Sequence, residues 1–279
     1  GCCCGFGIPV AQRFGARDEA GVRRSVAACA VLSLLASIVL TVVGVFFCRQ
    51  FLLWMQTPEE IMEGAYSFIS LVYAGICLFV FYQTQTNLVR ALGDSKTPTI
   101  LLAAGLSLNI VFEPIAILVL GWGIPGAALA TLASQVCGNL LCLAFILRRV
   151  PALHTHLADW RPDLSLYWAH LRIALPMGFQ SSIIAIGAVI LQVALNHLGP
   201  TAVAAYAAAQ KIESIAMMPM MSFGIAMAAY TAQNYGARKF HRIGEGVRKC
   251  SYMSLAFAVA AGAGLIAFGP LLLALFVGA

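Results

Sequence analysis

The chain has 279 residues and a net charge of +6; 61% of its residues are hydrophobic and only 10% are charged. A soluble domain carries about 25% charged residues, so this sequence cannot cover a water-facing surface and its solvent is a lipid bilayer. The positive charge does not indicate a nucleic-acid-binding protein, because the basic residues lie in short segments between apolar runs rather than on a soluble basic face.

Apolar runs of about 20 residues predict membrane-spanning helices, because that length crosses the hydrocarbon core. We expect helices near residues 1–14, 25–47, 65–89, 98–120, 126–147, 167–197, 201–233 and 251–276. The first run is too short to span, whereas the sixth and seventh are long enough to tilt, bend or extend beyond the hydrocarbon. The predicted fold class is all-α, a polytopic membrane helix bundle.

Lys and Arg alternate along the connections between these runs. Of the 17 basic residues, 15 lie in odd-numbered connections and one lies in an even-numbered connection. The positive-inside rule therefore places the odd-numbered connections in the cytoplasm. The remaining cation, Lys211, falls inside a predicted helix. These features predict an integral, multi-pass protein of a bacterial-type plasma membrane.

Residues 148–165, "RRVPALHTHLADWRPDLS", combine charge with two prolines and two histidines. This composition predicts a cytoplasmic linker between a first helical lobe, residues 1–147, and the start of a second, residues 166–279. The histidines are interpreted as solvated linker residues. The nine cysteines form no CxxC pair, so the sequence predicts neither a disulfide framework nor a metal site.

A short motif occurs twice, as "QRFGA" at residues 12–16 and as "QNYGA" at residues 233–237. Each copy ends one predicted helix and is followed by a basic cytoplasmic turn and another helix. Because both copies are cytoplasmic, they predict a parallel repeat about an axis along the membrane normal, as in some secondary transporters. The second copy is truncated. On this logic we expect one further helix before residue 1 and three after residue 279.

Several segments resemble the MATE (multidrug and toxic compound extrusion) transporters. "RALGDSKTP" at 90–98 resembles the family's turn between helices four and five, and "GWGIPGAALATLASQ" at 121–135 its junction between helices five and six. "LPMGFQSS" at 175–182 is similar to the start of helix seven, and "AAYAAAQKIE" and "YTAQNYGA" to helix eight. The family has twelve helices in two six-helix lobes, so the chain resembles helices two to nine, without helix one and helices ten to twelve.

The resemblance implies a secondary active transporter that exports small organic cations, including drugs, by alternating access. Its driving force would be Na⁺ or H⁺ flowing inward, and it would need no other cofactor. The expected partners are these small molecules and membrane lipid, and we expect a monomer when the chain is complete.

Glu113 is the single charged residue in the apolar run 98–120. A carboxylate at this depth is expensive unless it holds a proton or a cation. Asn109 shares its helix face, and Pro114 should free the carbonyl of Ile110. Oxygen ligands suit Na⁺, and burial suits H⁺ because it raises a carboxyl pKa. The alternative is a carboxylate near the helix end that reaches the headgroups.

In one branch of the MATE family an Asn and an acid at this spacing form a cation site with a Thr of helix six. The matching residues are Asn109, Glu113 and Thr131, with Glu in place of the usual Asp. An acid in helix one is a further ligand in that branch, and no counterpart occurs in this sequence.

Other polar residues are candidates for the substrate cavity. Thr131 is followed at four-residue spacing by Gln135 and Asn139, and the run "YQTQTN" at 82–87 contains Gln83. That run is alternatively the cytoplasmic end of its helix. In the second lobe the candidates are Gln180, Lys211 and Glu213.

Other function classes find less support. A flippase for lipid-linked oligosaccharides, from the same superfamily, should carry several cations in its cavity for phosphates, whereas Lys211 is the single cation predicted within the membrane. The sequence contains no HExxH, GxSxG or phosphate-loop motif, so we expect no enzyme. No charged ring or filter motif indicates a channel. A non-transporting membrane protein fragment remains an alternative.

Overall fold

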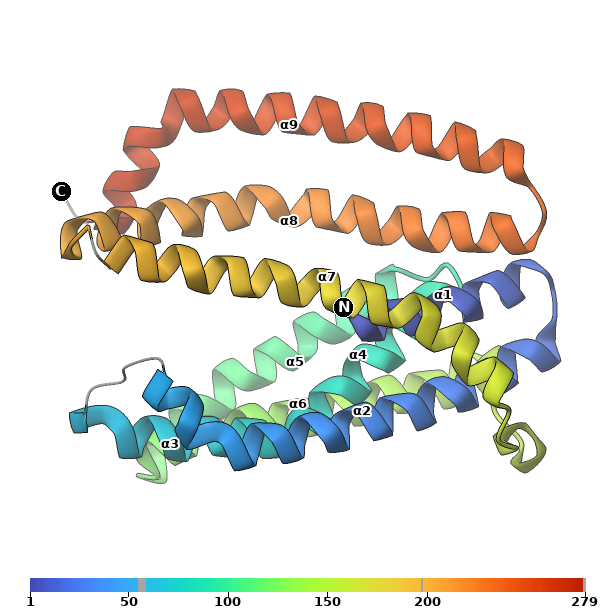
Figure 1. Cartoon of the computed structure of the whole chain (residues 1–279), viewed down its shortest axis with the longest axis horizontal. Coiled ribbons are helices and arrows are strands. Elements are labelled where there is room, and N and C mark those ends of the chain that lie inside the picture. The colour runs from blue at the N-terminus through green and yellow to red at the C-terminus, as the bar shows by residue number, and fades with distance from the viewer. Residues whose placement is uncertain (55–58, 197, 278–279) are drawn as a thin grey trace.

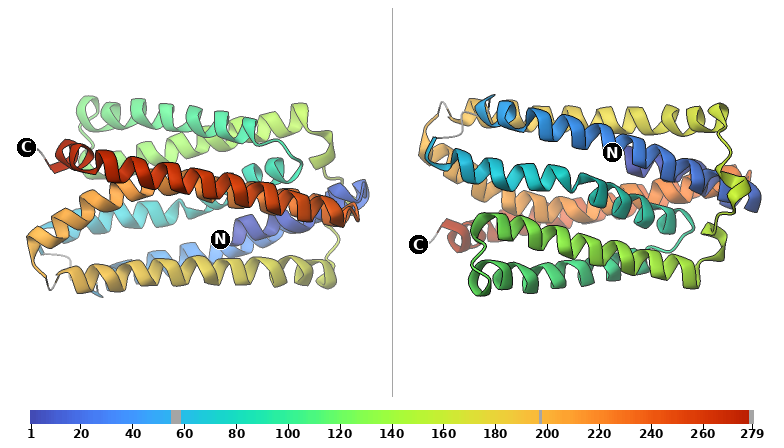
Figure 2. Two further views of the ribbon diagram at one scale, coloured as in Figure 1. Left: turned by 90° about the horizontal axis from the view of Figure 1, so that it is seen from above. Right: turned by 90° about the horizontal axis from the view of Figure 1, so that it is seen from below.

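The computed structural model describes residues 1–54, 59–196 and 198–277, and every regular element in these ranges is helical. The α-helices are α1 (Cys2–Gly15), α2 (Glu19–Trp54), α3 (Glu59–Ala74), α4 (Ile76–Ala91), α5 (Lys96–Pro114), α6 (Gly123–Arg149), α7 (Leu164–Asn196), α8 (Pro200–Gly236) and α9 (Phe240–Val277). A π-helix, η1 (Ile115–Val119), follows α5, and two 3-10 helices, η2 (Pro151–Leu153) and η3 (Leu157–Trp160), follow α6. The long helices run roughly along one direction, with α7, α8 and α9 beside the bundle formed by α1 to α6 (Figure 1 and Figure 2).

Six of the described helices are long and apolar enough to cross a membrane, or seven spans result if one bent pair counts as a single span. This confirms the polytopic, all-α architecture. The bent pair is α3 and α4, which meet at Gly75 at an angle of 44°. The span expected near 65–89 is therefore present as two helices with a bend between them, and not as one continuous helix. The side chain of Leu132 on α6 lies where a Cβ on residue 75 would be, so the glycine lets α6 pack into the bend.

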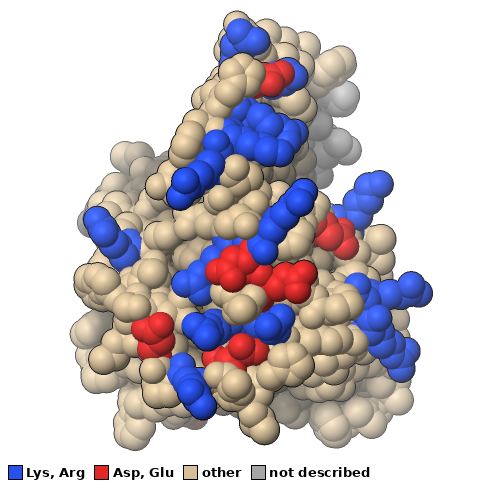
Figure 3. Space-filling model, turned by 90° about the vertical axis from the view of Figure 1, so that its right-hand side faces the viewer, with Lys and Arg blue, Asp and Glu red and all other residues tan. Residues whose placement is uncertain are grey.

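The four basic connections, α1–α2, α4–α5, α6–α7 and α8–α9, lie toward the same end of the molecule, on the right in Figure 1. Seen end-on, Lys and Arg side chains gather on this face with acidic side chains between them (Figure 3). Several of these basic residues are on helices rather than in loops, because α2 begins at Glu19 and α9 at Phe240. A run of apolar residues marks the hydrocarbon core, whereas a helix can continue into the headgroup region with charged residues.

The short helix α1 joins the two parts of the molecule. It packs against α2 and α4 on one side and against α7 and α8 on the other. Phe6, Val10 and Ala11 on α1 are fully buried. Gly5 approaches α7 so closely that an added Cβ would lie 2.5 Å from the Cα of Ala174. A displacement of α1 must therefore involve both of its neighbouring groups.

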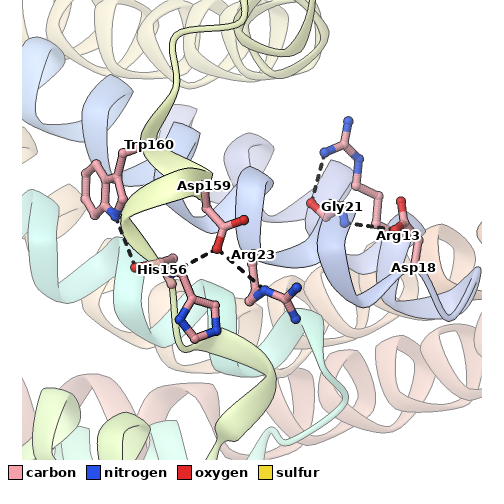
Figure 4. Close-up of polar contacts among 8 residues, drawn as sticks. Arg13, Asp18, Gly21, Arg23, His156, Asp159 and Trp160 are labelled. Carbon is pink, nitrogen blue, oxygen red and sulfur yellow. Dashed lines mark hydrogen bonds and ion pairs between the residues drawn. The ribbon is translucent and has the colours of Figure 1, made fainter.

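The α6–α7 linker is folded onto α2 through η2 and η3. The carboxylate of Asp159 accepts a hydrogen bond from the backbone N–H of His156 at 2.8 Å and lies 3.5 Å from Nε of Arg23 (Figure 4). The indole N–H of Trp160 donates to the hydroxyl of Thr155 at 3.3 Å. The predicted linker is thus an ordered connection, held by an ion pair whose Asp159 side chain is only 10% exposed.

Candidate functional site

The structure brings Asn109 and Thr131 together across the α5–α6 interface. The side-chain N–H of Asn109 donates to Oγ1 of Thr131 at 3.4 Å. The Thr131 hydroxyl donates in turn to the carbonyl of Ala127 at 3.0 Å, so its oxygen is free to accept. Both side chains are half-buried. Two of the three residues that the MATE resemblance predicts for a cation site are therefore neighbours in the fold.

Glu113 lies one turn beyond Asn109 on α5 and is also half-buried. In the described part of the chain, no hydrogen bond or ion pair joins its carboxylate to Asn109 or Thr131. The next residue is Pro114, after which the backbone changes to the π-helix η1. Pro lacks the N–H that an α-helix needs, and π-helical turns occur frequently at functional sites. Pro114 thus stands where the backbone changes from α-helix to π-helix, directly beside Glu113.

A cavity of about 130 Å³, here called the Asn109 cavity, lies between α4, α5 and α6. Its polar lining consists of Tyr82, Asn109, Thr131, Ser134 and Gln135. Hydroxyl and amide oxygens are hard ligands, which suit an alkali cation, a hydrated proton or water. Glu113 does not belong to the lining. Its carboxylate would reach the cavity after a change of its own side-chain rotamer or of the adjacent π-helix.

The polar residues spaced four apart on α6, Gln135 and Asn139, face α4 within the bundle. Gln135 lines the Asn109 cavity, and Asn139 donates to the backbone carbonyls of Leu78 and Gln135 at 2.9 Å each. The amide N–H of Gln85 donates to Oδ1 of Asn139 at 3.4 Å. The predicted substrate-lining residues of α6 therefore lie between helices of one bundle, and not between α1 and α8.

The run 82–87 belongs to the interior of the α1–α6 bundle rather than forming a solvated helix end. Tyr82, Thr84, Thr86 and Asn87 are buried, and Gln83 is half-buried. The hydroxyls of Thr84 and Ser33 are 2.8 Å apart. Tyr82 was not a predicted site residue, because a single aromatic residue in an apolar helix is indistinguishable from a packing residue in sequence.

A second cavity, of about 280 Å³ and here called the α1–α8 cavity, lies between α1, α4, α7 and α8. Gln180, one of the predicted substrate-lining residues, lines it together with Ser181, Asn87 and Arg90. Arg90 is half-buried and donates to Oδ1 of Asn87 at 3.3 Å. Sequence reasoning missed Arg90 because its position near a basic connection explained its charge.

Lys211 and Glu213 lie on exposed faces of α8. Neither belongs to the lining of the Asn109 cavity or the α1–α8 cavity. The structure thus keeps both residues apart from Gln180, with which they were grouped as substrate-lining residues. No arrangement of three or more metal-ligating side chains occurs among the described residues.

Comparison with known proteins gives one consistent family. A family model described as MatE matches residues 1–115 and 176–279. The chain is 28% identical over 251 residues to the probable multidrug resistance protein YoeA of Bacillus subtilis, covering 88% of this chain and 54% of that protein. It is 24% identical over 203 residues to an FAD transporter of Shewanella oneidensis, covering 71% of this chain and 45% of that protein. The chain spans about half the length of the curated relatives it matches.

Solved structures agree with the sequence matches. A structure described as the outward-facing conformation of a multidrug resistance MATE family transporter superposes with a TM-score of 0.91 at 26% identity, covering 99% of this chain and 62% of that one. A MOP superfamily transporter from Pyrococcus furiosus, described as having a binding pocket of reverse polarity, superposes with a TM-score of 0.90 at 25% identity and covers 100% of this chain and 62% of that one. The chain belongs to the MATE family of multi-pass membrane transporters.

Proposed function

We propose that the complete protein is a secondary active multidrug exporter, driven by inward flow of Na⁺ or H⁺ through a site in the α1–α6 bundle. The observation that carries the proposal is the Asn109–Thr131 hydrogen bond at a polar cavity inside a membrane-embedded bundle, one turn from Glu113. Placing a carboxylate and several oxygen ligands at membrane depth costs free energy. Such a group is therefore expected to serve a function.

Coupling requires that the ion and the substrate bias the same conformational change. The α1 helix supplies a physical connection, because it packs against α2 and α4 on one side and against α7 and α8 on the other. Occupation of the Asn109 cavity would alter the packing of α4, α5 and α6. Through α1, that change would reach the α1–α8 cavity, where we expect the transported compound to bind.

Gradient-driven uptake of ethidium into everted membrane vesicles, which corresponds to efflux from the cell, tests the proposal, using the complete open reading frame that contains this chain. Glu113→Gln preserves size but removes the titration and charge, so efflux should fall by at least about tenfold, or about 1.4 kcal/mol in the transport barrier. Glu113→Asp should retain partial activity. Glu213→Gln is the control, because Glu213 is exposed and lines neither cavity. Wild-type efflux by Glu113→Gln would refute coupling at this site.

Arg90 favours a second candidate, a substrate with an anionic group. It contributes a guanidinium to the α1–α8 cavity, and the described lining of that cavity contains no acidic residue. Arg suits phosphate because its planar fork can bind two oxygens. The relatives include an FAD transporter, and the flippase alternative would also need a phosphate site. Under this candidate, Arg90→Gln would reduce uptake of FAD into the same vesicles more than that of ethidium; the reverse preference would exclude it.

A further inference from the structure

Two polar atoms on α4 are buried inside the α1–α6 bundle and lack a hydrogen-bond partner among the described residues. They are the hydroxyl oxygen of Tyr82 and the amide oxygen of Gln85. Tyr82 is only 5% exposed. Buried polar groups in proteins are nearly always hydrogen-bonded, and ordered water serves where the fold leaves room for it. Both side chains line cavities, which provide that room.

Tyr82 contributes to the Asn109 cavity, on the side opposite α5. Its ring packs 3.5 Å from the Cβ position of Gly138 on α6, so a larger residue there would fill the space beside the ring. A water molecule takes up roughly 30 Å³, so a cavity of 130 Å³ has room for more than one. The phenol can donate to one water and accept from another, which makes it a suitable member of a hydrogen-bonded chain.

Gln85 lines a different cavity, here called the linker cavity, which lies between α2, α4 and α6 and measures about 530 Å³. His154 and His156 of the α6–α7 linker line the same space, together with Thr84 of α4. The linker lies at the basic end of the molecule. The linker cavity therefore extends from the level of Gln85 to the predicted cytoplasmic end.

A hydrogen-bonded layer of two amides links the linings of the two cavities: Gln85 lines the linker cavity, and Asn139 bonds to the backbone of Gln135, which lines the Asn109 cavity. Asn139 is held firmly, because its amide donates to the carbonyls of Leu78 and Gln135 at 2.9 Å each. Gln85 is held by one long bond of 3.4 Å to Asn139. Bonds of this length are weaker than those near 2.9 Å, so Gln85 is the member of the layer that can swing aside.

We propose that Tyr82 and Gln85 line a hydrated path inside the α1–α6 bundle, through which protons pass from the Glu113–Asn109 site to the cytoplasm. The inference rests on the proposed function and deepens it by specifying H⁺ as the coupling ion. After a change of rotamer brings the Glu113 carboxyl to the Asn109 cavity, its proton leaves, the carboxyl becomes a carboxylate, and the proton moves along hydrogen-bonded water past Tyr82. When Gln85 swings aside, the proton continues into the linker cavity and reaches bulk water.

The charges along this path are consistent with proton passage. Glu113 stands near one end, and His154 and His156 line the other. Between them, the titratable and charged groups that interact with Tyr82 are Cys142 of α6, which is fully buried, and Arg90 of α4. At the Gln85–Asn139 contact a proton needs only a file of hydrogen-bonded water molecules, whereas a sodium ion would have to keep or replace most of its hydration shell in the same space.

Hydroxyl-radical footprinting with X-rays tests for the water, because radicals formed in trapped water modify adjacent aromatic rings. Phe6 is the matched control: it is 3% exposed and lines none of the three cavities. We expect Tyr82 to be modified at least about threefold faster than Phe6. Modification at the rate of Phe6 would overturn the proposal.

Proton movement is measured with the complete open reading frame in proteoliposomes that contain a pH-sensitive dye. Tyr82→Phe removes only the hydroxyl, and Gln85→Leu removes the amide; each should slow substrate-coupled proton flow at least fivefold while ethidium binding stays unchanged. Thr86→Val is the control, because Thr86 is buried one turn from Tyr82 on α4 and lines neither cavity. Wild-type proton flow in both variants, with flow abolished in Glu113→Gln, would refute the path alone. Wild-type flow in Glu113→Gln would refute the proposed coupling site instead, and the path would then be judged by the labelling of Tyr82.

Discussion

The two copies of the QxxGA motif can be compared directly, because each ends a helix at the basic end of the molecule. Residues 12–18 follow α1 into α2, and residues 233–239 follow α8 into α9. Arg17 has a φ of 58° and Arg238 a φ of 56°, the two positive values among non-glycine residues of the described chain. The backbone N–H of Ala16 donates to the Gln12 carbonyl at 2.9 Å, and that of Ala237 to the Gln233 carbonyl at 3.0 Å. The two turns thus share one backbone conformation.

The copies also touch each other, and they do so reciprocally. A Cβ on Gly15 would lie 2.6 Å from the carbonyl carbon of Gln233, and a Cβ on Gly236 would lie 2.6 Å from that of Gln12. The same two positions of each motif therefore form both halves of the contact. This is the arrangement that a two-fold axis along the membrane normal produces, and it confirms the parallel repeat inferred from sequence.

The side chains of the two copies make different contacts. Arg13 donates from Nη1 to the Gly21 carbonyl at 2.9 Å and to the Ser25 hydroxyl at 2.8 Å, which ties α1 to α2. Among the described residues, the side chain of its counterpart Asn234 bonds within α8 alone, to the Tyr230 carbonyl at 2.8 Å. The repeat has retained its glycines where the copies meet, and its side chains have diverged where each copy faces its own neighbours.

Alanine at either glycine should break the shared contact, and this is the largest effect we expect. An added methyl group against backbone costs about 1–3 kcal/mol, so Gly15→Ala and Gly236→Ala should each shift the population toward separated α1 and α8 ends by about tenfold. Distances between spin labels at positions 16 and 237, measured by pulsed electron resonance, would report the separation.

Gly244→Ala is the control for both variants, because nothing lies within 4 Å of its Cβ position on α9. The two glycine variants should have equal effects, since the contact is reciprocal. An effect confined to one of them would show that the two halves of the contact do not carry equal weight.

Removal of Arg13 and of Asn234 should reveal the divergence of the copies. Arg13→Ala loses two bonds from a charged donor to a neighbouring helix, so we expect a loss of about 2 kcal/mol in unfolding free energy. Asn234→Ala loses one bond within its own helix and should cost about 1 kcal/mol. Denaturant titration of the detergent-solubilised protein measures both. Equal losses would contradict the asymmetry of the contacts.

The side-chain contacts of Gln233 and Gln12 also differ, and we expect a smaller effect on stability than at Arg13. The Gln233 amide donates to the Ala91 carbonyl at 2.7 Å and so joins α8 to α4. Gln233→Ala should weaken the contact between the ends of α1 and α8 by about 1 kcal/mol, the typical value for a hydrogen bond. Gln12 makes no comparable side-chain bond within the described chain, so Gln12→Ala should be nearly neutral. The spin-label distances at positions 16 and 237 distinguish the two, and a larger shift for Gln12→Ala would reverse the assignment.

Much of this architecture could be predicted from sequence, because apolar length and charge alternation report directly on the bilayer. The repeat was visible since glycine is required wherever two backbones meet, as at Gly15 and Gly236. The Asn109–Thr131 pair followed from a family resemblance rather than from periodicity. The helix ends were less predictable: α9 begins at Phe240, well before the apolar run that marks its membrane portion.

The orientation of polar side chains was the main feature that sequence could not supply. The spacing of Gln135 and Asn139 shows that they share a face of α6, but not which neighbour that face meets. On α4, Gln85 bonds to Asn139 and Tyr82 lines the same cavity as Gln135, and α4 follows the 44° bend at Gly75 into which Leu132 packs. A contact that depends on such tertiary packing leaves no periodic signal.

The last and smallest expected difference concerns the residue that begins each following helix. Asp18 caps α2 by accepting a hydrogen bond from the Gly21 N–H at 2.9 Å, whereas Lys239 occupies the equivalent position before α9. A carboxylate at a helix N-terminus is favourable, and a cation there is not, because the first backbone N–H groups carry partial positive charge.

Lys239→Asp should therefore stabilise the first turn of α9 by about 0.5–1 kcal/mol. Hydrogen exchange measured by mass spectrometry should show slower exchange in the peptide that follows residue 239. Arg248→Asp introduces the same change of charge two turns further on without a cap, so it should not slow this exchange. Equal protection in the two variants would mean that net charge, and not the cap present in the first copy, distinguishes the two turns.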